Sequence, residues 1–151
     1  TLDPVDIEFY DLTVKLQTKI YFEEGSSKIR HERTILEMSN PDAEVEINEY
    51  MVACYGTTEY PEDMTGITLT AKNASESKSL TYEYKDLASA DEVSAVIPAI
   101  ETKAAMGASG SDATGYFKEG YAFSPMFTLG YTKTLKDKEV FSTWLSLEKA
   151  N

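Results

Sequence analysis

Apolar and polar residues alternate with a period of two along several stretches of this chain, and no other feature constrains the fold as strongly. Residues 14–22 form the longest example, since Val14, Leu16, Ile20 and Phe22 alternate with mostly polar neighbours. Successive side chains of a strand point to opposite faces of a sheet, so the pattern predicts half-buried β-strands. The same alternation recurs over residues 28–38, 67–72, 80–85, 123–131 and 141–147.

Short polar segments separate these strands and predict three hairpins. Residues 23–27 include Gly25, which can supply a positive φ, and residues 73–77 consist mainly of turn-forming types. Residues 136–138 form the third turn. The last segment has two interpretations, because residues 137–149 also fit helical spacing and can be read as a strand or a helix.

Two segments carry the signals of helices. Residues 40–42 read Asn-Pro-Asp, a helix start with an N-cap, Pro at N1 and an acid in the first turn. Residues 89–92 read Ser-Ala-Asp-Glu, which is a capping box. Each start is followed by an apolar stripe at helical spacing. The stripes are Ile47, Met51, Cys54 and Tyr55 in the first segment, and Val93, Val96, Ile97 and Ile100 in the second, where Pro98 is expected to kink or end the helix.

These elements predict an α+β fold. We expect mainly an antiparallel β-sheet or partly closed barrel of about six or seven strands, with one or two packed helices. A chain of 151 residues is expected to form a single domain, 1–151. Residues 1–12 are interpreted as a short strand or an extended arm. Residues 104–120 are rich in Gly, Ala, Ser and Thr and are interpreted as a flexible loop.

Acidic residues outnumber basic ones by 26 to 14, which gives a net charge of −12. A surface of this charge repels phosphates and anionic membranes, so we expect no specific nucleic-acid binding. It does not argue against a protein that lets DNA slide past without adhering. No apolar run is long enough for a membrane span, and no charged-then-apolar leader stands at the numbered start.

The residues that usually carry chemistry do not form a catalytic or metal-binding pattern here. His31, the single histidine, has no nucleophile or orienting acid at a recognisable spacing. Cys54, the single cysteine, lies on an apolar stripe and excludes an intrachain disulfide. Asp42, Glu46 and Glu49 are interpreted as one solvated helix face. We therefore predict a protein that is not an enzyme, with no catalytic residues, no metal and no cofactor.

The second half of the chain resembles the major tail (tail-tube) proteins of long-tailed bacteriophages. The resemblance rests on the order of parts: strand 80–85, Asp86-Leu87, the segment with Asp91-Glu92-Val93, a variable loop, strand 123–131 with Gly130-Tyr131, and a strand containing Trp144. It implies a structural subunit in the virion that forms hexameric rings, stacks them and lines a DNA conduit. The acidic composition suits such a lumen, because like charge keeps DNA from adhering.

Self-assembly into a homo-oligomer is therefore the expected function, and other structural proteins are further candidate partners. The charged hairpin 15–38 and the aromatic residues around 104–123 are the expected contact regions. The candidate contact residues are Lys28, Arg30, Arg33, Tyr116, Phe117 and Tyr121. As an alternative, units 14–55 and 66–100 look similar to small bacterial lipoproteins of the YehR type. That resemblance implies a secreted or lipid-anchored domain at the cell surface that binds a ligand or partner.

Overall fold

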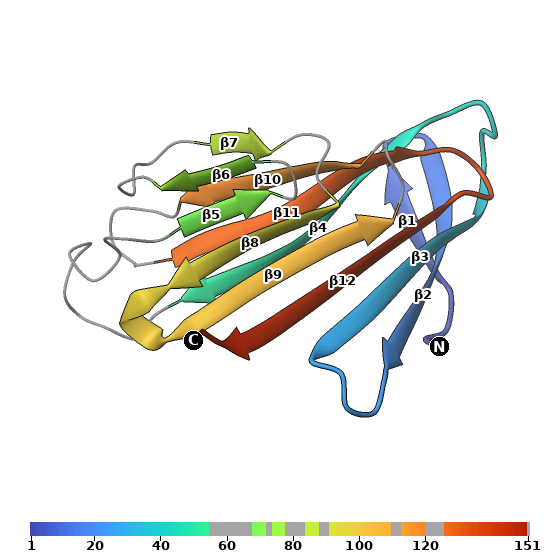
Figure 1. The fold of residues 1–151 in the computed structure, drawn as a ribbon. Coiled ribbons are helices and arrows are strands. Elements are labelled where there is room, and N and C mark those ends of the chain that lie inside the picture. Colours follow the sequence, from blue (N-terminus) through green and yellow to red (C-terminus); the bar gives the residue numbers. More distant parts are fainter. Residues whose placement is uncertain are drawn as a thin grey trace.

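The computed structural model describes residues 1–54, 68–71, 74–77, 84–87, 91–109, 113–119 and 126–150. These residues form twelve β-strands and one short 3-10 turn (Figure 1). The predicted α+β class is therefore wrong, because the described part of the chain contains no packed α-helix.

The strands form two antiparallel sheets. The larger sheet has eight strands in the order β1-β2-β3-β12-β9-β8-β5-β6, and the smaller has four in the order β4-β11-β10-β7. The strands of the larger sheet are β1 (Val5–Phe9), β2 (Leu12–Phe22), β3 (Lys28–Met38), β5 (Thr68–Ala71), β6 (Ala74–Ser77), β8 (Glu92–Ile97), β9 (Thr102–Ser109) and β12 (Val140–Lys149). Those of the smaller sheet are β4 (Val45–Cys54), β7 (Tyr84–Leu87), β10 (Thr114–Glu119) and β11 (Met126–Leu135).

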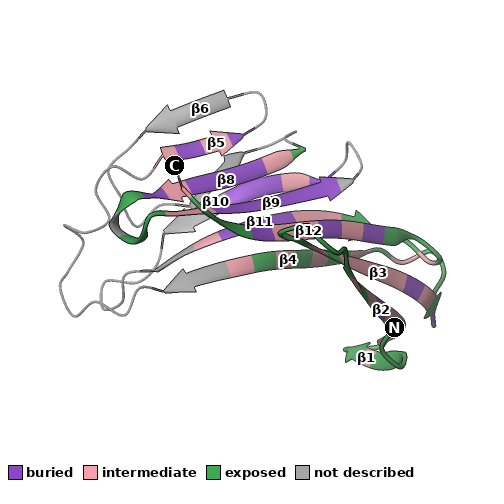
Figure 2. Ribbon diagram, turned by 60° about the horizontal axis from the view of Figure 1, so that its bottom comes forward, coloured by how far each residue is buried: buried purple, intermediate pink, exposed green. Residues whose placement is uncertain are grey.

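The hydrophobic core lies between the inner faces of the two sheets. Strands β8, β9 and β12 of the larger sheet contact β11 of the smaller one, and their burial is visible in Figure 2. Alternate residues point inward, as the period-two pattern requires. The largest fully buried side chains are Tyr131, Phe141, Ile35, Leu69, Ile97, Met106, Leu129, Leu135 and Val93.

The first predicted helix is the strand β4, and the helix-start signal at residues 40–42 is a turn. The Asn40 side chain accepts a hydrogen bond from the Asp42 amide at 3.1 Å, and the Asn40 carbonyl accepts one from the Ala43 amide at 3.1 Å. Asn caps turns as readily as helices, so the signal was ambiguous. Val45, Ile47 and Met51 then pack against the core with strand spacing.

The second predicted helix is the strand β8. Val93, Ala95 and Ile97 are fully buried at a spacing of two, whereas the helical reading used Val93, Val96 and Ile97. Pro98 ends the strand and starts the 3-10 turn η2 (Pro98–Ile100). A short apolar run fits both the helical and the strand period. Here pairing with the neighbouring strands of the larger sheet decides in favour of a strand.

The predicted flexible loop 104–120 is wrong as well, because it contains most of β9 and β10. Its small residues serve close packing. A Cβ atom at Gly107 would lie 2.2 Å from Nε1 of Trp144, on the neighbouring strand β12. Gly107 is therefore small because the indole ring lies against its backbone.

The predicted strands are largely correct, but only one of the three predicted hairpins forms as expected. Strands β2 and β3 pair directly, and Gly25 in their turn has φ +76°. The C-terminal segment is a strand, β12, and not a helix. The expected hairpin between β11 and β12 does not form: β12 pairs with β3 and β9, and β11 pairs with β4 and β10 in the other sheet. Residues 74–77, expected as a turn, form β6 against β5, and residues 80–83 lie outside the described residues.

The contact between Gly107 and Trp144 predicts the effect of a single methyl group. We expect Gly107→Ala to lower the free energy of unfolding by about 1–3 kcal/mol, because the indole ring must move to admit the Cβ atom. Urea unfolding followed by far-UV circular dichroism measures this loss, and this signal is also present in a chain that lacks Trp144, the single tryptophan. The matched control is the same substitution in a Trp144→Ala chain, where the loss should largely disappear.

Burial of Tyr131 predicts a loss of stability at high pH. Burial first, and then the nearby charges of Asp91 and Glu92, raise the pKa of the Tyr131 phenol above its ordinary value of 10.0. The folded protein therefore holds this proton more tightly than the unfolded chain. The stabilisation is complete below about pH 10 and declines as the pH rises further. Urea titrations above pH 10 should show a smaller decline in the free energy of unfolding for Tyr131→Phe than for the wild type.

Candidate assembly surface

The inner face of the larger sheet passes from buried to exposed along β2. Val14 near the start of this strand is 2% exposed, whereas Ile20 and Phe22 near its end are 37% and 75% exposed. All three residues point to the same face, because they lie an even number of positions apart. One apolar face therefore begins in the core and continues into solvent.

The edge strand β1 extends this exposed face. Val5 pairs with Leu16 and Phe9 with Leu12, which places both side chains on the inner face. Val5 is 53% exposed and Phe9 is 51% exposed. Figure 2 shows β1 as an exposed strand at the far end of the sheet from the buried strands β8 and β9. We call Val5, Phe9, Ile20 and Phe22 the open strip.

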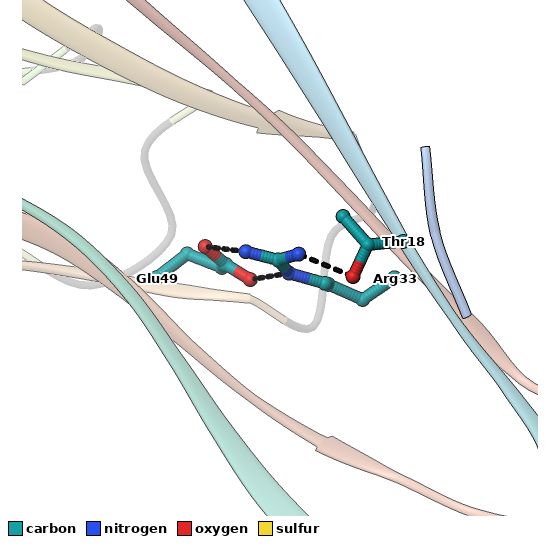
Figure 3. A network of polar contacts seen from close by, with 3 residues as sticks. All are labelled: Thr18, Arg33 and Glu49. Carbon is teal, nitrogen blue, oxygen red and sulfur yellow. Dashed lines mark hydrogen bonds and ion pairs between the residues drawn. The ribbon is translucent and has the colours of Figure 1, made fainter. Parts of the chain in front are cut away.

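A polar row separates Ile20 and Phe22 of the open strip from the core, whereas Val5 and Phe9 lie beside Leu16 and Leu12 on the core side of this row. Arg33 on β3 pairs in register with Thr18 on β2, and its guanidinium donates a hydrogen bond to the Thr18 hydroxyl. The same guanidinium contacts both carboxylate oxygens of Glu49 on β4, with Nε 2.5 Å from Oε1 and Nη2 3.4 Å from Oε2 (Figure 3). The neighbouring row on one side holds the buried Ile35, and the row on the other side holds Ile20 and His31.

This row also ties the two sheets together, because β3 belongs to the larger sheet and β4 to the smaller one. A two-point contact between guanidinium and carboxylate is directional and stronger than a single hydrogen bond. Glu49, expected on a solvated helix face with Asp42 and Glu46, instead points inward and is 12% exposed in its side chain. Sequence reasoning missed this role because it assigned the segment to a helix.

Both sheets present open edges beside the strip. Among the described residues β1 pairs with β2 alone, and β4 pairs with β11 alone. An edge strand offers unpaired amide and carbonyl groups to another chain. The molecule thus combines exposed apolar side chains with backbone groups available for pairing.

Two of the predicted contact residues lie on the opposite face of this sheet. The Lys28 ammonium lies over the Trp144 ring at 4.0 Å from its centroid, and the Arg30 guanidinium lies over the Tyr21 ring at 3.9 Å. Both cations are therefore engaged in cation–π contacts within the chain. Arg33, the third, belongs to the polar row described above.

Of the three predicted aromatic contact residues, the structure describes the side chain of Tyr116. Tyr116 is buried in the smaller sheet and its ring covers Gly130, where a Cβ atom would lie 2.4 Å from the ring. Burial, and then Tyr50, raise the pKa of its phenol. Phe117 lies on β10, but its side chain is outside the described part, as is the whole of Tyr121. Sequence reasoning did not single out the open strip. The alternation of apolar and polar residues along β2 shows which face is apolar, but it does not show how much of that face the second sheet covers.

A second feature lies beside Trp144. A hollow of about 310 Å³ is lined by Thr70, Ala71, Asp91, Glu92 and Trp144. The Glu92 carboxylate lies 3.8 Å from the Lys103 ammonium, so part of its charge is balanced. The hollow combines an indole edge, a hydroxyl and carboxylates, which are groups that can contact a small polar ligand.

No metal centre is found among the described residues, since no three His, Cys, Asp or Glu side chains gather in a suitable group. Cys54 lies on β4, and its side chain is outside the described part. Within the same residues, no helix has the length and apolar character that a membrane crossing requires.

The fold places the chain among antiparallel two-sheet β proteins. The crystal structure of HI1317 is similar to it, with a TM-score of 0.57 and 10% sequence identity over 95% of this chain. The chain covers 63% of the length of HI1317. At this identity the likeness concerns the fold alone. No protein-family model matches the sequence, and no curated protein matches it.

The contact between Arg33 and Glu49 predicts coupled losses of stability. We expect Arg33→Met and Glu49→Gln each to lower the free energy of unfolding by about 1–3 kcal/mol. Arg33→Met leaves the Glu49 carboxylate without its guanidinium, and Glu49→Gln replaces a charged group with two acceptor oxygens by a neutral one with a single acceptor oxygen. The double variant should lose less than the two single losses combined. Urea unfolding of the four chains measures the coupling. Lys136→Met, which removes an exposed ion pair with Glu44 at 3.3 Å, should change stability by less than about 0.5 kcal/mol.

Proposed function

We propose that this protein is a non-enzymatic structural subunit that assembles with copies of itself through the open strip. The observation that carries the proposal is the exposure of Val5, Phe9, Ile20 and Phe22 on a face that is core elsewhere in the same sheet. Exposed large apolar side chains that gather on one face are typical of interaction sites.

Opposing forces act on such an assembly. Burial of the strip favours association by about 25 cal/mol for each Å² of apolar surface removed from water. The net charge of −12 on each copy opposes it. Added salt or divalent cations screen this repulsion. Assembly should therefore strengthen as salt concentration rises.

The particular form that we propose is a tail-tube-like ring in a virion, stacked around an acidic lumen. Two features of the chain support this form. The sheets are antiparallel with open edges at β1 and β4, so neighbouring copies can continue them. The acidic excess suits a conduit that DNA passes without adhering. In this function the chain uses no cofactor and catalyses no reaction.

Self-assembly is tested by light scattering behind size exclusion and by negative-stain electron microscopy of the purified protein. We expect the mass to rise with protein concentration and with added divalent cations, and rings, tubes or filaments to appear. Phe22→Ser, at the most exposed position of the strip, should lower the assembled fraction at least tenfold, since a hydroxyl replaces a phenyl ring at the contact.

The matched control is Val140→Ser, which removes an exposed apolar side chain, 43% exposed, outside the open strip. This variant should assemble like the wild type. A wild-type protein that stays monomeric at high concentration and with divalent cations would contradict the proposal. Equal effects of Phe22→Ser and Val140→Ser would argue for nonspecific adhesion instead of assembly through the strip.

The alternative function is ligand binding by a secreted or lipid-anchored surface domain. The hollow beside Trp144 favours it, because its volume of about 310 Å³ falls at the lower end of the range for small-molecule sites. A monomeric protein whose Trp144 fluorescence changes on addition of a small polar ligand would support this function over assembly.

A further inference from the structure

The turn that joins β1 to β2 holds a bulky residue in an unfavourable conformation. Phe9 and Leu12 pair directly, so the turn consists of Tyr10 and Asp11 alone. Tyr10 has φ +54°. Two-residue hairpin turns of this kind place glycine, asparagine or aspartate at such positions, because a large side chain at positive φ crowds the backbone. Tyr10 is also fully exposed, so its ring has no burial to offset the strain.

Strand β1 is weakly held by the rest of the chain. Val5 and Phe9 are half exposed on one face, and Asp6 and Glu8 are exposed on the other. Among the described residues its strand partner is β2 alone. Separation of β1 from β2 would therefore disturb one side of one strand and the Ile7–Val14 pair at the margin of the core.

We propose that β1 is exchanged between copies, so that β1 of one copy pairs with β2 of another. This inference rests on the proposed self-assembly and names its mechanism. In the exchanged form the chain runs straight from β1 into β2, and Tyr10 leaves the left-handed conformation. Strained short hinges favour this kind of exchange, which is a low-cost route to oligomers.

Exchange preserves every contact that β1 makes in its own chain, because the acceptor strand is identical. The apolar pairs Val5–Leu16 and Phe9–Leu12 re-form between copies, and Asp6 lies opposite Lys15 as before. The release of strain at Tyr10 is therefore not offset by lost contacts. Exchange also brings the open strips of two copies next to each other. The exposed apolar residues of the two β2 strands then form one continuous surface.

A disulfide between two different chains detects the exchange directly. One chain carries Asp6→Cys and the other carries Lys15→Cys with a mass tag, both with Cys54→Ser. Asp6 and Lys15 are exposed and opposite each other in register, a geometry that suits a cross-strand disulfide. The two chains are mixed in urea, refolded together and oxidised. We expect a disulfide-linked dimer with the mass of one chain of each kind.

The separate outcomes distinguish the inference from the proposed function. A chain carrying both cysteines should yield interchain disulfides in its assembled fraction. If light scattering shows assemblies while this chain forms intrachain disulfides only and the mixture yields no mixed dimer, exchange is wrong and assembly stands. If all chains remain monomeric, the proposed function fails, and the exchange fails with it.

The role of the turn is tested by Tyr10→Gly, since glycine adopts a positive φ without steric cost. This variant should reduce the yield of mixed dimer severalfold. Lys138→Gly is the matched control, because Lys138 also has a positive φ, +67°, in the turn between β11 and β12. An equal reduction in both variants, or none in Tyr10→Gly, would overturn the role assigned to the strained turn.

Discussion

The two sheets differ in width, and this inequality governs the rest of the structure. A sheet buries an apolar face only where another layer covers it. Four strands cannot cover the whole inner face of eight, so one face holds both the core and the open strip. Figure 1 shows the result: β1, β2 and β3 lie at one side of the molecule, away from β5, β6 and β7. The exposure of the open strip thus follows from the architecture of the two sheets.

The polar row of Thr18, Arg33 and Glu49 lies where covered and uncovered surface meet. A charged pair deep in the core would lose its hydration without full compensation. At this boundary, water still reaches part of the guanidinium, and the carboxylate satisfies the rest. The row links the sheets by a directional contact at the point where apolar packing ends. It therefore marks the boundary between the buried Ile35 and the exposed Ile20 and Phe22.

The strands that local patterns predicted are largely correct, but most of their partners are not, and several further strands were expected as helices, a loop or a turn. The alternation over residues 14–22 and 28–38 identified a hairpin, because strand and turn signals there agree and the partners are adjacent in sequence. Strands β11 and β12 are also adjacent, yet they belong to different sheets, and no local signal records that crossing. The capping signal before β4 is a real hydrogen-bonding signal that a turn uses equally well.

Small residues also misled the prediction of secondary structure, and this affected the predicted contact residues. In residues 104–120 they suggested mobility, whereas Gly107 lies under Trp144 within a central strand. The site prediction followed the same error, because it placed Tyr116 at the edge of a mobile loop, where the structure buries it. Among the predicted contact residues whose side chains the structure describes, only Arg33 borders the open strip, and it does so through a contact within the chain.

The charges on and beside strand β1 oppose its pairing with most other strands and allow it with some. Its outward-facing Asp6 and Glu8 discourage pairing with other acidic chains, which is a common protection of edge strands. Lys15, opposite Asp6, offsets that protection at a single place. A strand that pairs with β2 and places a carboxylate opposite Lys15 gains a favourable charge contact. A strand in another register places its carboxylates against the acidic surface and is repelled. In the exchange that we propose, this charge pattern favours β1 of an identical chain over an unrelated strand, with electrostatics providing the specificity and the apolar strip the driving force.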